Sequence, residues 1–361
     1  MVAAANTEPT LKQSCAVDLT FPYHREENTL EHLHALSDFI GEDRDKLAQS
    51  KDVLEQELAA LFGKAAALWF PTGTMAQGIA ARIHAERAKS RTLILHPTSH
   101  LLLHEEEGYK HLHGLEAQVV GDWRDTIKPD MLTAGAACAF VEMSQRHSGG
   151  LLPSWQELCA LKQRARDLAL PLHMDGARIW SCRPHYDNRS FAEVADGFSS
   201  LYVSLYKDIG ALPGAVLIGD QDFIDEAKVW QARMGGALVH ATLMAADALR
   251  LVDQRLTQME GFIVHARLMA DAVTDIAGVT VSPARPQTNL FHLMLPCGPK
   301  TAEQARDRVA QETGIWLSNR FWAYEGEHIC AMEITVGEKA MALPLDSFAD
   351  AVRNLLKFIG E

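Results

Sequence analysis

The chain has 361 residues and a formal net charge of −13, because 34 Lys and Arg residues face 47 Asp and Glu residues. This acidic balance argues against a protein that binds nucleic acid through its phosphate backbone, which needs an excess of basic residues. No apolar run approaches the roughly 20 residues of a membrane-spanning helix, so we expect no membrane segment. The N-terminus lacks the pattern of a signal peptide, and the six scattered cysteines are typical of a reducing compartment. We therefore expect a cytoplasmic protein.

The central part of the chain alternates between helical and strand patterns. Residues 51–62 carry leucines at helical spacing, whereas the short apolar runs 92–96 and 138–143 predict buried strands. Ser154 and Glu157 form a capping-box pattern, which predicts that a helix begins there. Further strand-like segments follow at 170–175, 201–205 and 215–219.

Strands that alternate with helices predict a mainly parallel sheet covered on both faces. In such a sheet, ligands bind beyond the carboxyl ends of the strands. After about residue 260 the pattern changes: helical stretches at 261–277 and 301–312 flank short strands near 290–295 and 329–336, which predicts a small α+β domain. We expect an N-terminal segment, a large domain and a small C-terminal domain, at residues 1–40, 41–255 and 256–361.

Small residues open a helix after the first of these strands. Thr72, Gly73 and Thr74 lie between the apolar residues 66–70 and a helical stretch. The free N–H groups and positive dipole end of such a helix suit a phosphate, although a plain capped turn has the same pattern. The segment is not a GxxxxGK[ST] loop, and the chain contains no GxGxxG, so those nucleotide-binding motifs give no support.

Two further segments at strand ends carry ionisable residues. Asp175, followed by Gly176, Ala177 and Arg178, can hold a cationic ring nitrogen, or can be an ordinary Asp–Gly turn. Lys207 follows the strand at 201–205, where partial burial lowers the pKa of a lysine and makes it a usable nucleophile; the alternative is a surface lysine. Together with the phosphate-binding pattern, these residues predict a site for pyridoxal phosphate.

Residues 41–80 resemble the opening of the threonine aldolase family, within the β-eliminating lyase group of fold-type I pyridoxal-phosphate enzymes. Further matches run through to about residue 295, at Ser99-His100 with Glu105, Glu142 ahead of Gly149-Gly150, Asp175 to Arg178, Lys207 with Gly210-Ala211, Gly235-Gly236 and Gln287-Thr288-Asn289. The resemblance implies an α/β large domain with a mainly parallel sheet, a small α+β C-terminal domain, and a homodimer or homotetramer with active sites at subunit interfaces.

The resemblance also implies roles for individual residues. Lys207 would be the Schiff-base lysine, Asp175 the partner of the pyridine nitrogen, and His100 the residue that stacks on the cofactor ring and helps to handle the substrate's β-hydroxyl. Arg178 would lie near the substrate carboxylate and the cofactor. The expected cofactor contacts are Thr72, Gly73, Thr74, His100, Asp175, Arg178, Ser204 and Lys207.

The chain is rich in histidine, with 16 in all, and a metal site is the first explanation to test. His96, His100 and His104 are spaced by four, as ligands on one helix face are. However, Pro97 interrupts such a helix, and the stacking role accounts for His100. We therefore expect no metal, and we expect His104, His111 and His113 to be polar surface or interface residues.

The chain departs from the family where the substrate carboxylate is bound. Phe21 stands at the position of an expected serine, and our alignment puts Met332 at the position of an expected arginine. Because an unpaired carboxylate is costly in a partly buried site, another donor must replace them. Arg320 is the candidate, and a surface arginine stacked on Trp322 is the alternative.

These patterns predict an enzyme that cleaves a β-hydroxy-α-amino acid, such as threonine, allo-threonine or phenylserine, into glycine and an aldehyde. The altered carboxylate-binding positions leave open β-elimination, racemisation or transamination of another amino acid. A different class is suggested by Ser204 and Lys207, which fit the SxxK signature of serine acyl-enzymes, but its companion motifs are missing or out of order. A non-catalytic binding protein with the same fold is the last alternative.

Overall fold

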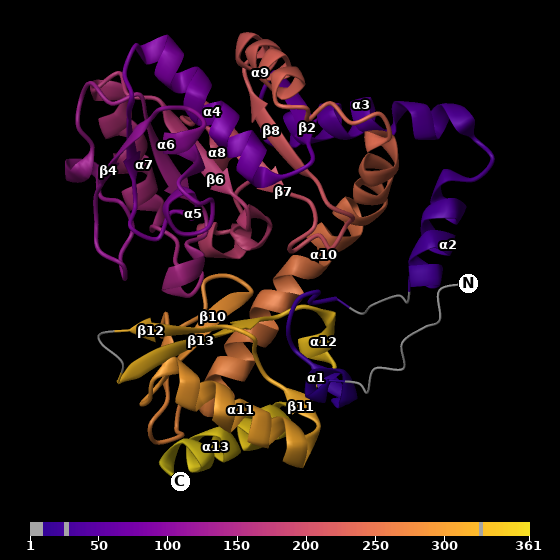
Figure 1. Ribbon diagram of the computed structural model, residues 1–361, viewed down its shortest axis with the longest axis vertical. Coiled ribbons are helices and arrows are strands. Elements are labelled where there is room, and N and C mark those ends of the chain that lie inside the picture. Colours follow the sequence, from indigo (N-terminus) through magenta and orange to yellow (C-terminus); the bar gives the residue numbers. More distant parts are fainter. Residues whose placement is uncertain (1–9, 25–28, 325–327) are drawn as a thin grey trace. The chain divides into compact units, whose positions relative to one another are not determined.

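The computed structural model describes residues 10–24, 29–324 and 328–361 (Figure 1). The chain folds as two compact units, one of residues 26–260 and the other of residues 1–25 and 261–361. The long helix α10 (Ala241–Val273) contributes residues to both units.

The unit of residues 26–260 is built on a central sheet that has seven strands in the described part of the chain. In spatial order these are β2 (Ala66–Phe70), β8 (Ala215–Gly219), β7 (Ser200–Ser204), β6 (Leu172–Gly176), β5 (Cys138–Glu142), β3 (Thr92–Leu95) and β4 (Glu116–Val119). Strand β8 is antiparallel to both of its neighbours, and every other pair is parallel. The predicted mainly parallel sheet is confirmed; β4 was not predicted, and the other strands lie within two residues of the predicted runs.

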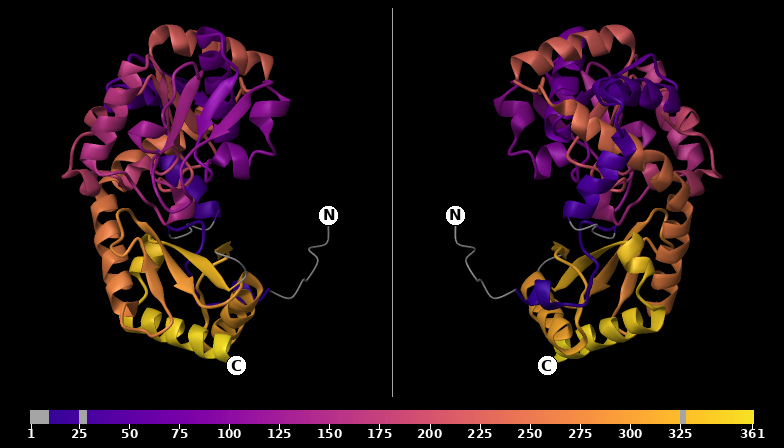
Figure 2. Two further views of the ribbon diagram at one scale, coloured as in Figure 1. Left: turned by 90° about the vertical axis from the view of Figure 1, so that its left-hand side faces the viewer. Right: turned by 90° about the vertical axis from the view of Figure 1, so that its right-hand side faces the viewer.

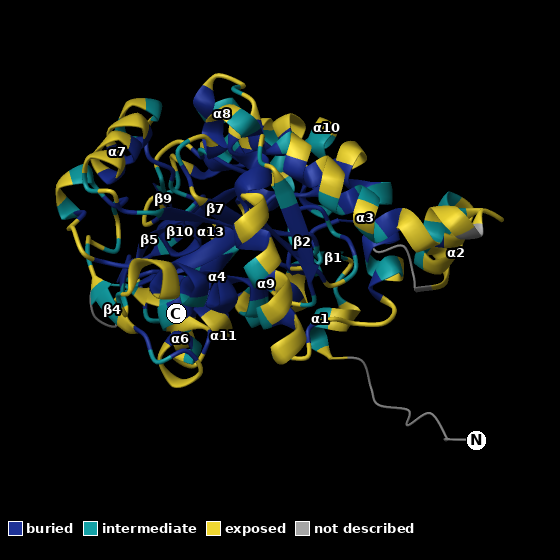
Figure 3. Cartoon of the chain, turned by 90° about the horizontal axis from the view of Figure 1, so that it is seen from above, coloured by how far each residue is buried: buried dark blue, intermediate teal, exposed yellow. Residues whose placement is uncertain are grey.

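This unit also contains helices, most of which pack around the sheet. They are α2 (Thr29–Ile40), α3 (Arg44–Leu61), α4 (Gly73–Ala88), α5 (His100–Leu103), α6 (Gly108–His111), α7 (Trp155–Asp167), α8 (Phe191–Ala195) and α9 (Gln221–Arg233). Short 3₁₀ turns lie at Pro129–Met131, Arg146–Ser148, Ile179–Ser181 and Arg183–Tyr186. Figure 3 shows the central strands buried and the outward turns of the helices exposed, whereas the edge strand β4 is only partly buried.

Helices α4 and α9 pack against each other and against β8 and β2. The apolar side chains between them include Phe70, Ile79, Leu217 and Phe223, all 1% exposed or less. Burying side chains of this size stabilises the fold by about 1.5–3 kcal/mol each. This core fixes the position of the first turn of α4.

Caps explain where two helices begin. Helix α7 begins as predicted, because Ser154 Oγ accepts a hydrogen bond from the Glu157 amide at 3.2 Å and the Glu157 carboxylate accepts one from the Ser154 amide at 2.8 Å. Helix α3 begins earlier than the leucine spacing predicts. The Asp43 carboxylate caps it by accepting hydrogen bonds from the amides of Asp45 and Lys46, at 2.9 and 3.0 Å.

The other unit contains an antiparallel sheet in the order β12 (Phe321–Tyr324), β13 (Ile329–Thr335), β10 (Leu290–Leu295) and β9 (Thr280–Ser282). A parallel pair joins β1 (Val17–Asp18) to β11 (Ile315–Trp316). Besides part of α10, this unit contains the helices α1 (Leu11–Ser14), α11 (Pro299–Thr313), α12 (Glu338–Met341) and α13 (Leu345–Gly360). Helices α11 and α13 lie side by side, and α11 packs on β12 and β13 (Figure 2).

The predicted start of the helix over residues 261–277 is wrong. Helix α10 runs unbroken from Ala241 to Val273, through the point where the pattern changes. The stretch 241–260 contains neither proline nor glycine, and a side chain added at Gly261 would meet nothing within 4 Å. Nothing in the sequence therefore ends the helix at residue 260.

Candidate active site

The start of α4 forms one wall of a cavity of about 280 Å³ in the unit of residues 26–260. Thr72 caps the helix: its hydroxyl accepts a hydrogen bond from the Met75 amide at 3.2 Å. A Cβ added to Gly73 would lie 2.5 Å from Tyr202 Oη, so only glycine lets the backbone pass this close. The cavity is lined by Pro71, Thr72, Gly73, Thr74, Gln77, His100, Tyr202, Tyr206, Lys207 and Pro213.

Lys207 also belongs to this lining and follows β7 by three residues. Burial, and next the positive charge of Arg178, lower the pKa of Lys207 to about 8, although the negative charge of Asp175 opposes the shift. The ammonium donates to Tyr202 Oη at 3.5 Å. More of this side chain is therefore a neutral amine at neutral pH than in an ordinary lysine, and the neutral amine is the form that attacks a carbonyl group.

Asp175 lies near the end of β6 and is 4% exposed. Its Oδ1 accepts a hydrogen bond from the Ala177 amide at 3.1 Å. A Cβ at Gly176 would lie 2.6 Å from the Tyr202 carbonyl oxygen, which explains the glycine after the aspartate. Arg178 follows and is 6% exposed. The predicted carboxylate and arginine are thus both buried and close enough to Lys207 to shift its pKa in opposite directions.

Ser204 is completely buried at the end of β7. Its carbonyl accepts a hydrogen bond from Trp180 Nε1 at 2.8 Å, and its hydroxyl is buried without a hydrogen-bond partner. The described lining of the cavity contains Lys207 and the α4 turn, but not Ser204, Asp175 or Arg178.

His100 begins α5 and lines the same cavity. Its Nδ1 is hydrogen-bonded to Oε1 of Glu105 at 2.7 Å, and the Glu105 side chain is 2% exposed. Burial raises the pKa of Glu105, while the hydrogen bond to His100 acts to lower it. The bond orients the ring and favours a proton on Nδ1, which leaves Nε2 as the nitrogen that can accept another.

The sequence alone assigned no role to some residues that lie in or beside the site. Tyr202 and Tyr206 line the cavity beside Lys207. Tyr202 is in register with Asp175 on the neighbouring strand, so the alternation of side chains along adjacent strands is the signal that could have found it. Glu142 is in register with Asp175 on its other side.

Arg320 and Phe21 line a second cavity, of about 310 Å³, in the unit of residues 1–25 and 261–361. Arg320 Nε lies 3.6 Å from Oε1 of Glu333, whose side chain is 4% exposed. Met332 is completely buried and does not belong to the lining, whereas Glu333 does. Successive residues of a strand point to opposite faces, so at this cavity the side chain to consider is the acidic Glu333 rather than Met332.

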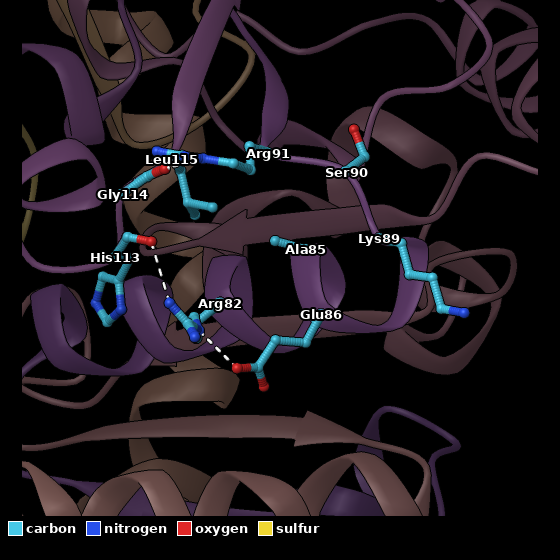
Figure 4. A pocket seen from close by; sticks show the side chains of 9 residues that line it. All are labelled: Arg82, Ala85, Glu86, Lys89, Ser90, Arg91, His113, Gly114 and Leu115. Atoms are coloured by element: carbon cyan, nitrogen blue, oxygen red, sulfur yellow. Dashed lines mark hydrogen bonds and ion pairs between the residues drawn. The ribbon is translucent and has the colours of Figure 1, made fainter.

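A cavity of about 430 Å³ lies at the opposite end of α4 (Figure 4). Arg82 pairs with Glu86 at 2.7 Å and donates to the His113 carbonyl oxygen at 3.2 Å. Arg91 donates to the Gly114 carbonyl oxygen at 2.6 Å. The guanidinium groups of Arg82 and Arg91 already have hydrogen-bond acceptors, and the negative, C-terminal end of α4 lies here. The larger volume of this cavity therefore does not make it the reactive site.

Three findings concern the histidines and the class of protein. His113, expected at a surface or interface, is only 7% exposed, whereas His111 is exposed. Within the described ranges, no three His, Cys, Asp or Glu side chains are grouped as ligands of a metal ion. No helix among the described residues combines the length and the apolar character needed to cross a membrane.

Comparison with known proteins identifies relatives. The chain is 27% identical over 284 residues to the low-specificity L-threonine aldolase 1 of Arabidopsis thaliana, covering 73% of this chain and 77% of the relative. It is 27% identical over 262 residues to the low specificity L-threonine aldolase of Escherichia coli K12, covering 70% and 76%. The structure of a Listeria monocytogenes protein, provisionally described as an L-allo-threonine aldolase, superposes with a TM-score of 0.86 at 30% identity, covering 96% and 98%.

More distant structures share the fold alone. The threonine aldolase of Leishmania major superposes with a TM-score of 0.69 at 13% identity, covering 95% of this chain and 99% of that one. The predicted fold-type I architecture is confirmed by these neighbours together with the mainly parallel sheet. Residues 37–295 match the beta-eliminating lyase family, and the chain belongs to that family.

Proposed function

We propose that the protein is a pyridoxal-phosphate-dependent lyase that cleaves a β-hydroxy-α-amino acid of the threonine, allo-threonine or phenylserine type into glycine and an aldehyde. One observation carries this proposal: Lys207 and the start of α4 line the same cavity. The pKa of Lys207 is lowered to about 8. Membership of the family and the likeness to aldolases from three organisms support the reaction class.

The residues present fit the proposed cofactor. The amides at the start of α4 suit a phosphate, and the close approach of Gly73 to Tyr202 leaves the turn without a side chain that would occupy the cavity. Lys207 provides the amine for a covalent link, and the negative charge of Asp175 suits a protonated pyridine nitrogen. When bound, pyridoxal phosphate supplies an electron sink for the carbanion that forms at Cα.

The side chains of the chain then have distinct tasks. Lys207 would hold the cofactor through a covalent link to its side-chain amine. His100 takes the proton of the β-hydroxyl at Nε2, and Glu105 stabilises the imidazolium that results. Arg178 is proposed to bind near the substrate carboxylate and the cofactor. Thr72, Gly73 and Thr74 are proposed to hold the phosphate, and Ser204 to contact the cofactor.

Arg320 is proposed as a second residue for the substrate carboxylate. Its support is its position on the wall of a cavity beside Phe21, together with the loss of the arginine that the family pattern leads us to expect. The nearby carboxylate of Glu333, 3.6 Å from Arg320, competes for the same guanidinium. We expect a carboxylate to bind more weakly here than it would at an arginine without an acidic neighbour.

The second candidate reaction is β-elimination, racemisation or transamination of another amino acid with the same cofactor. It is favoured by the acidic Glu333 and the bulky Phe21 on the cavity where Arg320 lies. Release of a keto acid and ammonia in place of glycine and an aldehyde would decide for elimination.

The test uses the purified protein loaded with pyridoxal phosphate and incubated separately with L-threonine, L-allo-threonine and phenylserine. The proposal expects glycine and the matching aldehyde in equal amounts from at least one of them. A Lys207→Ala variant is the control for non-enzymatic cleavage. Absence of glycine from all three incubations with the wild-type protein would refute the aldolase assignment.

We also propose that the protein is a cytoplasmic homo-oligomer, a dimer or a tetramer, with residues 41–255 as the cofactor-binding domain, 256–361 as the small domain and 1–40 as an N-terminal segment. All six cysteines are free, which supports a reducing compartment. Leu30 and Leu33 on α2 are 61% and 53% exposed, which supports an apolar contact with another subunit. Sedimentation of the holoenzyme measures the oligomeric state.

A further inference from the structure

Two histidines beside the proposed active site share a hydrogen bond through their ring nitrogens. Nε2 of His104 lies 2.7 Å from Nε2 of His147. A neutral imidazole has one nitrogen that donates and one that accepts, so this contact holds one proton between the two rings. The ring planes are 18° from parallel and the centroids lie 5.0 Å apart, so the two rings meet end to end along this hydrogen bond, and Trp123 packs against His147 at a steep angle.

This pair continues to His100. The centroids of the His100 and His104 rings are 5.0 Å apart, and His100 lines the cavity that contains Lys207. On its other side, His100 is held by the buried carboxylate of Glu105. His104 is exposed to solvent, whereas His147 is only 5% exposed. Three neighbouring imidazole rings therefore lead from the cavity wall to the exposed side chain of His104.

We propose that the His104–His147 pair is a proton relay between His100 and solvent. When His100 has taken the β-hydroxyl proton at Nε2, that proton passes through water between the two rings to Nδ1 of His104, and the proton shared in the pair moves from His104 Nε2 to His147 Nε2. The pair then carries one positive charge spread over two rings, and His104 returns it to neutrality by giving a proton to water. Only N–H and O–H bonds form and break, and the reverse sequence returns a proton to the site.

The relay acts through His100, so His104 and His147 are positioning and proton-transfer residues, and the proposal rests on the proposed function. The test compares His104→Phe and His147→Phe with wild type. Phenylalanine keeps a flat ring, which at position 147 still packs against Trp123, and removes both nitrogens. His111→Phe is the matched control, because the His111 side chain is 66% exposed, lies in the same segment and pairs only weakly with Glu107 at 3.7 Å.

With threonine as the substrate, each relay variant is expected to lower kcat by at least about tenfold at low buffer concentration, with KM unchanged. Added imidazole, which carries protons in solution, is expected to restore most of the lost kcat in the relay variants and to leave wild type and His111→Phe unaffected. A loss of kcat that imidazole does not rescue would overturn the relay, as would an unchanged kcat.

A second readout does not depend on activity. The cofactor-free wild-type protein, followed by nitrogen NMR of its histidine side chains, is expected to show His104 and His147 titrating as a coupled pair. His147→Phe should return His104 to a single independent titration. Independent titration of both rings in wild type would overturn the shared proton. Failure of wild type to release glycine, with the coupled titration intact, would refute the proposed function and leave the pair standing.

Discussion

Glu142 and Asp175 are register partners on the adjacent parallel strands β5 and β6, which brings two carboxyl groups together at the end of the sheet. Burial, and next the negative charge of Asp175, raise the pKa of Glu142 to about 8. The Arg146 amide donates a hydrogen bond to Glu142 Oε1 at 3.0 Å, which acts in the opposite direction. Glu142 is therefore mostly protonated at neutral pH.

Replacing Glu142 by glutamine tests this relationship through stability. Because the pKa of Glu142 is about 8 when folded and about 4.3 when unfolded, the folded state binds more protons between these values. The contribution of Glu142 to stability therefore falls as pH rises through this window, by up to about 1.4 kcal/mol per pH unit. Glu142→Gln keeps the shape and stays neutral, so its stability relative to wild type should increase with pH. Urea unfolding across the window measures the difference, and a difference independent of pH would contradict the pairing.

For the buried histidines His84 and His173 we expect the opposite pH dependence of stability, at acidic pH. Both are buried, and both contact the Ser200 hydroxyl, at 2.7 and 2.8 Å. Burial lowers the pKa of His84 to about 3, and it also lowers the pKa of His173. The unfolded state therefore binds more protons between about pH 6.5 and pH 3, so stability falls as pH falls through this range.

The variant His84→Leu removes one of these titrating groups and leaves the Ser200–His173 bond in place. We expect its stability to fall less steeply with acid than that of wild type, whatever its stability at neutral pH. His111→Leu, at an exposed histidine, should keep the wild-type slope. Thermal unfolding in a series of acidic buffers measures these slopes, and parallel curves for wild type and His84→Leu would show that the buried ring is not the cause.

Gly73→Ala separates binding of the cofactor from stability of the fold. The added methyl would lie 2.5 Å from Tyr202 Oη and 2.6 Å from its Cζ, and the ring must shift where the cavity lies. We expect the affinity for pyridoxal phosphate to fall by at least about tenfold, which is a loss of about 1.4 kcal/mol. Gly261→Ala in α10 is the control, because its methyl meets nothing within 4 Å and should stabilise the helix by about 0.5–1 kcal/mol. Equal cofactor affinity in the two variants would contradict the role of Gly73.

Much of the architecture followed from local pattern. Short β-branched and apolar runs such as 138–143 predict buried strands because both faces of a parallel sheet are covered, and Ser154 with Glu157 marks a helix start because the cap is a local hydrogen-bonding device. A residue at the end of such a strand, as Lys207 and Asp175 are, must lie at the ligand-binding edge. Their roles as cofactor ligands stay predictions.

The rest depended on contacts between distant segments. Met332 and Glu333 are neighbours in a strand, so their side chains lie on opposite faces. A single sequence does not fix which of the two faces the cavity. The contact of His104 with His147 joins residues 43 positions apart, and no spacing along the chain encodes it. The length of α10 was missed because a change of composition near residue 260 is not a helix stop.

The central claim is that Lys207 is the lysine that links covalently to the cofactor, and labelling tests it most directly. Lys162 is an internal control: it is 4% exposed, its pKa is lowered to about 8 chiefly by burial, and its ammonium donates to the Val194 carbonyl oxygen at 2.9 Å, away from the cavity. The protein is loaded with an equimolar amount of pyridoxal phosphate, reduced with borohydride, digested and analysed by mass spectrometry. The account predicts the added cofactor mass on the peptide that contains Lys207 and not on the one that contains Lys162, with no such label in Lys207→Ala. Label on another lysine in the wild-type protein, or none at all, would contradict it.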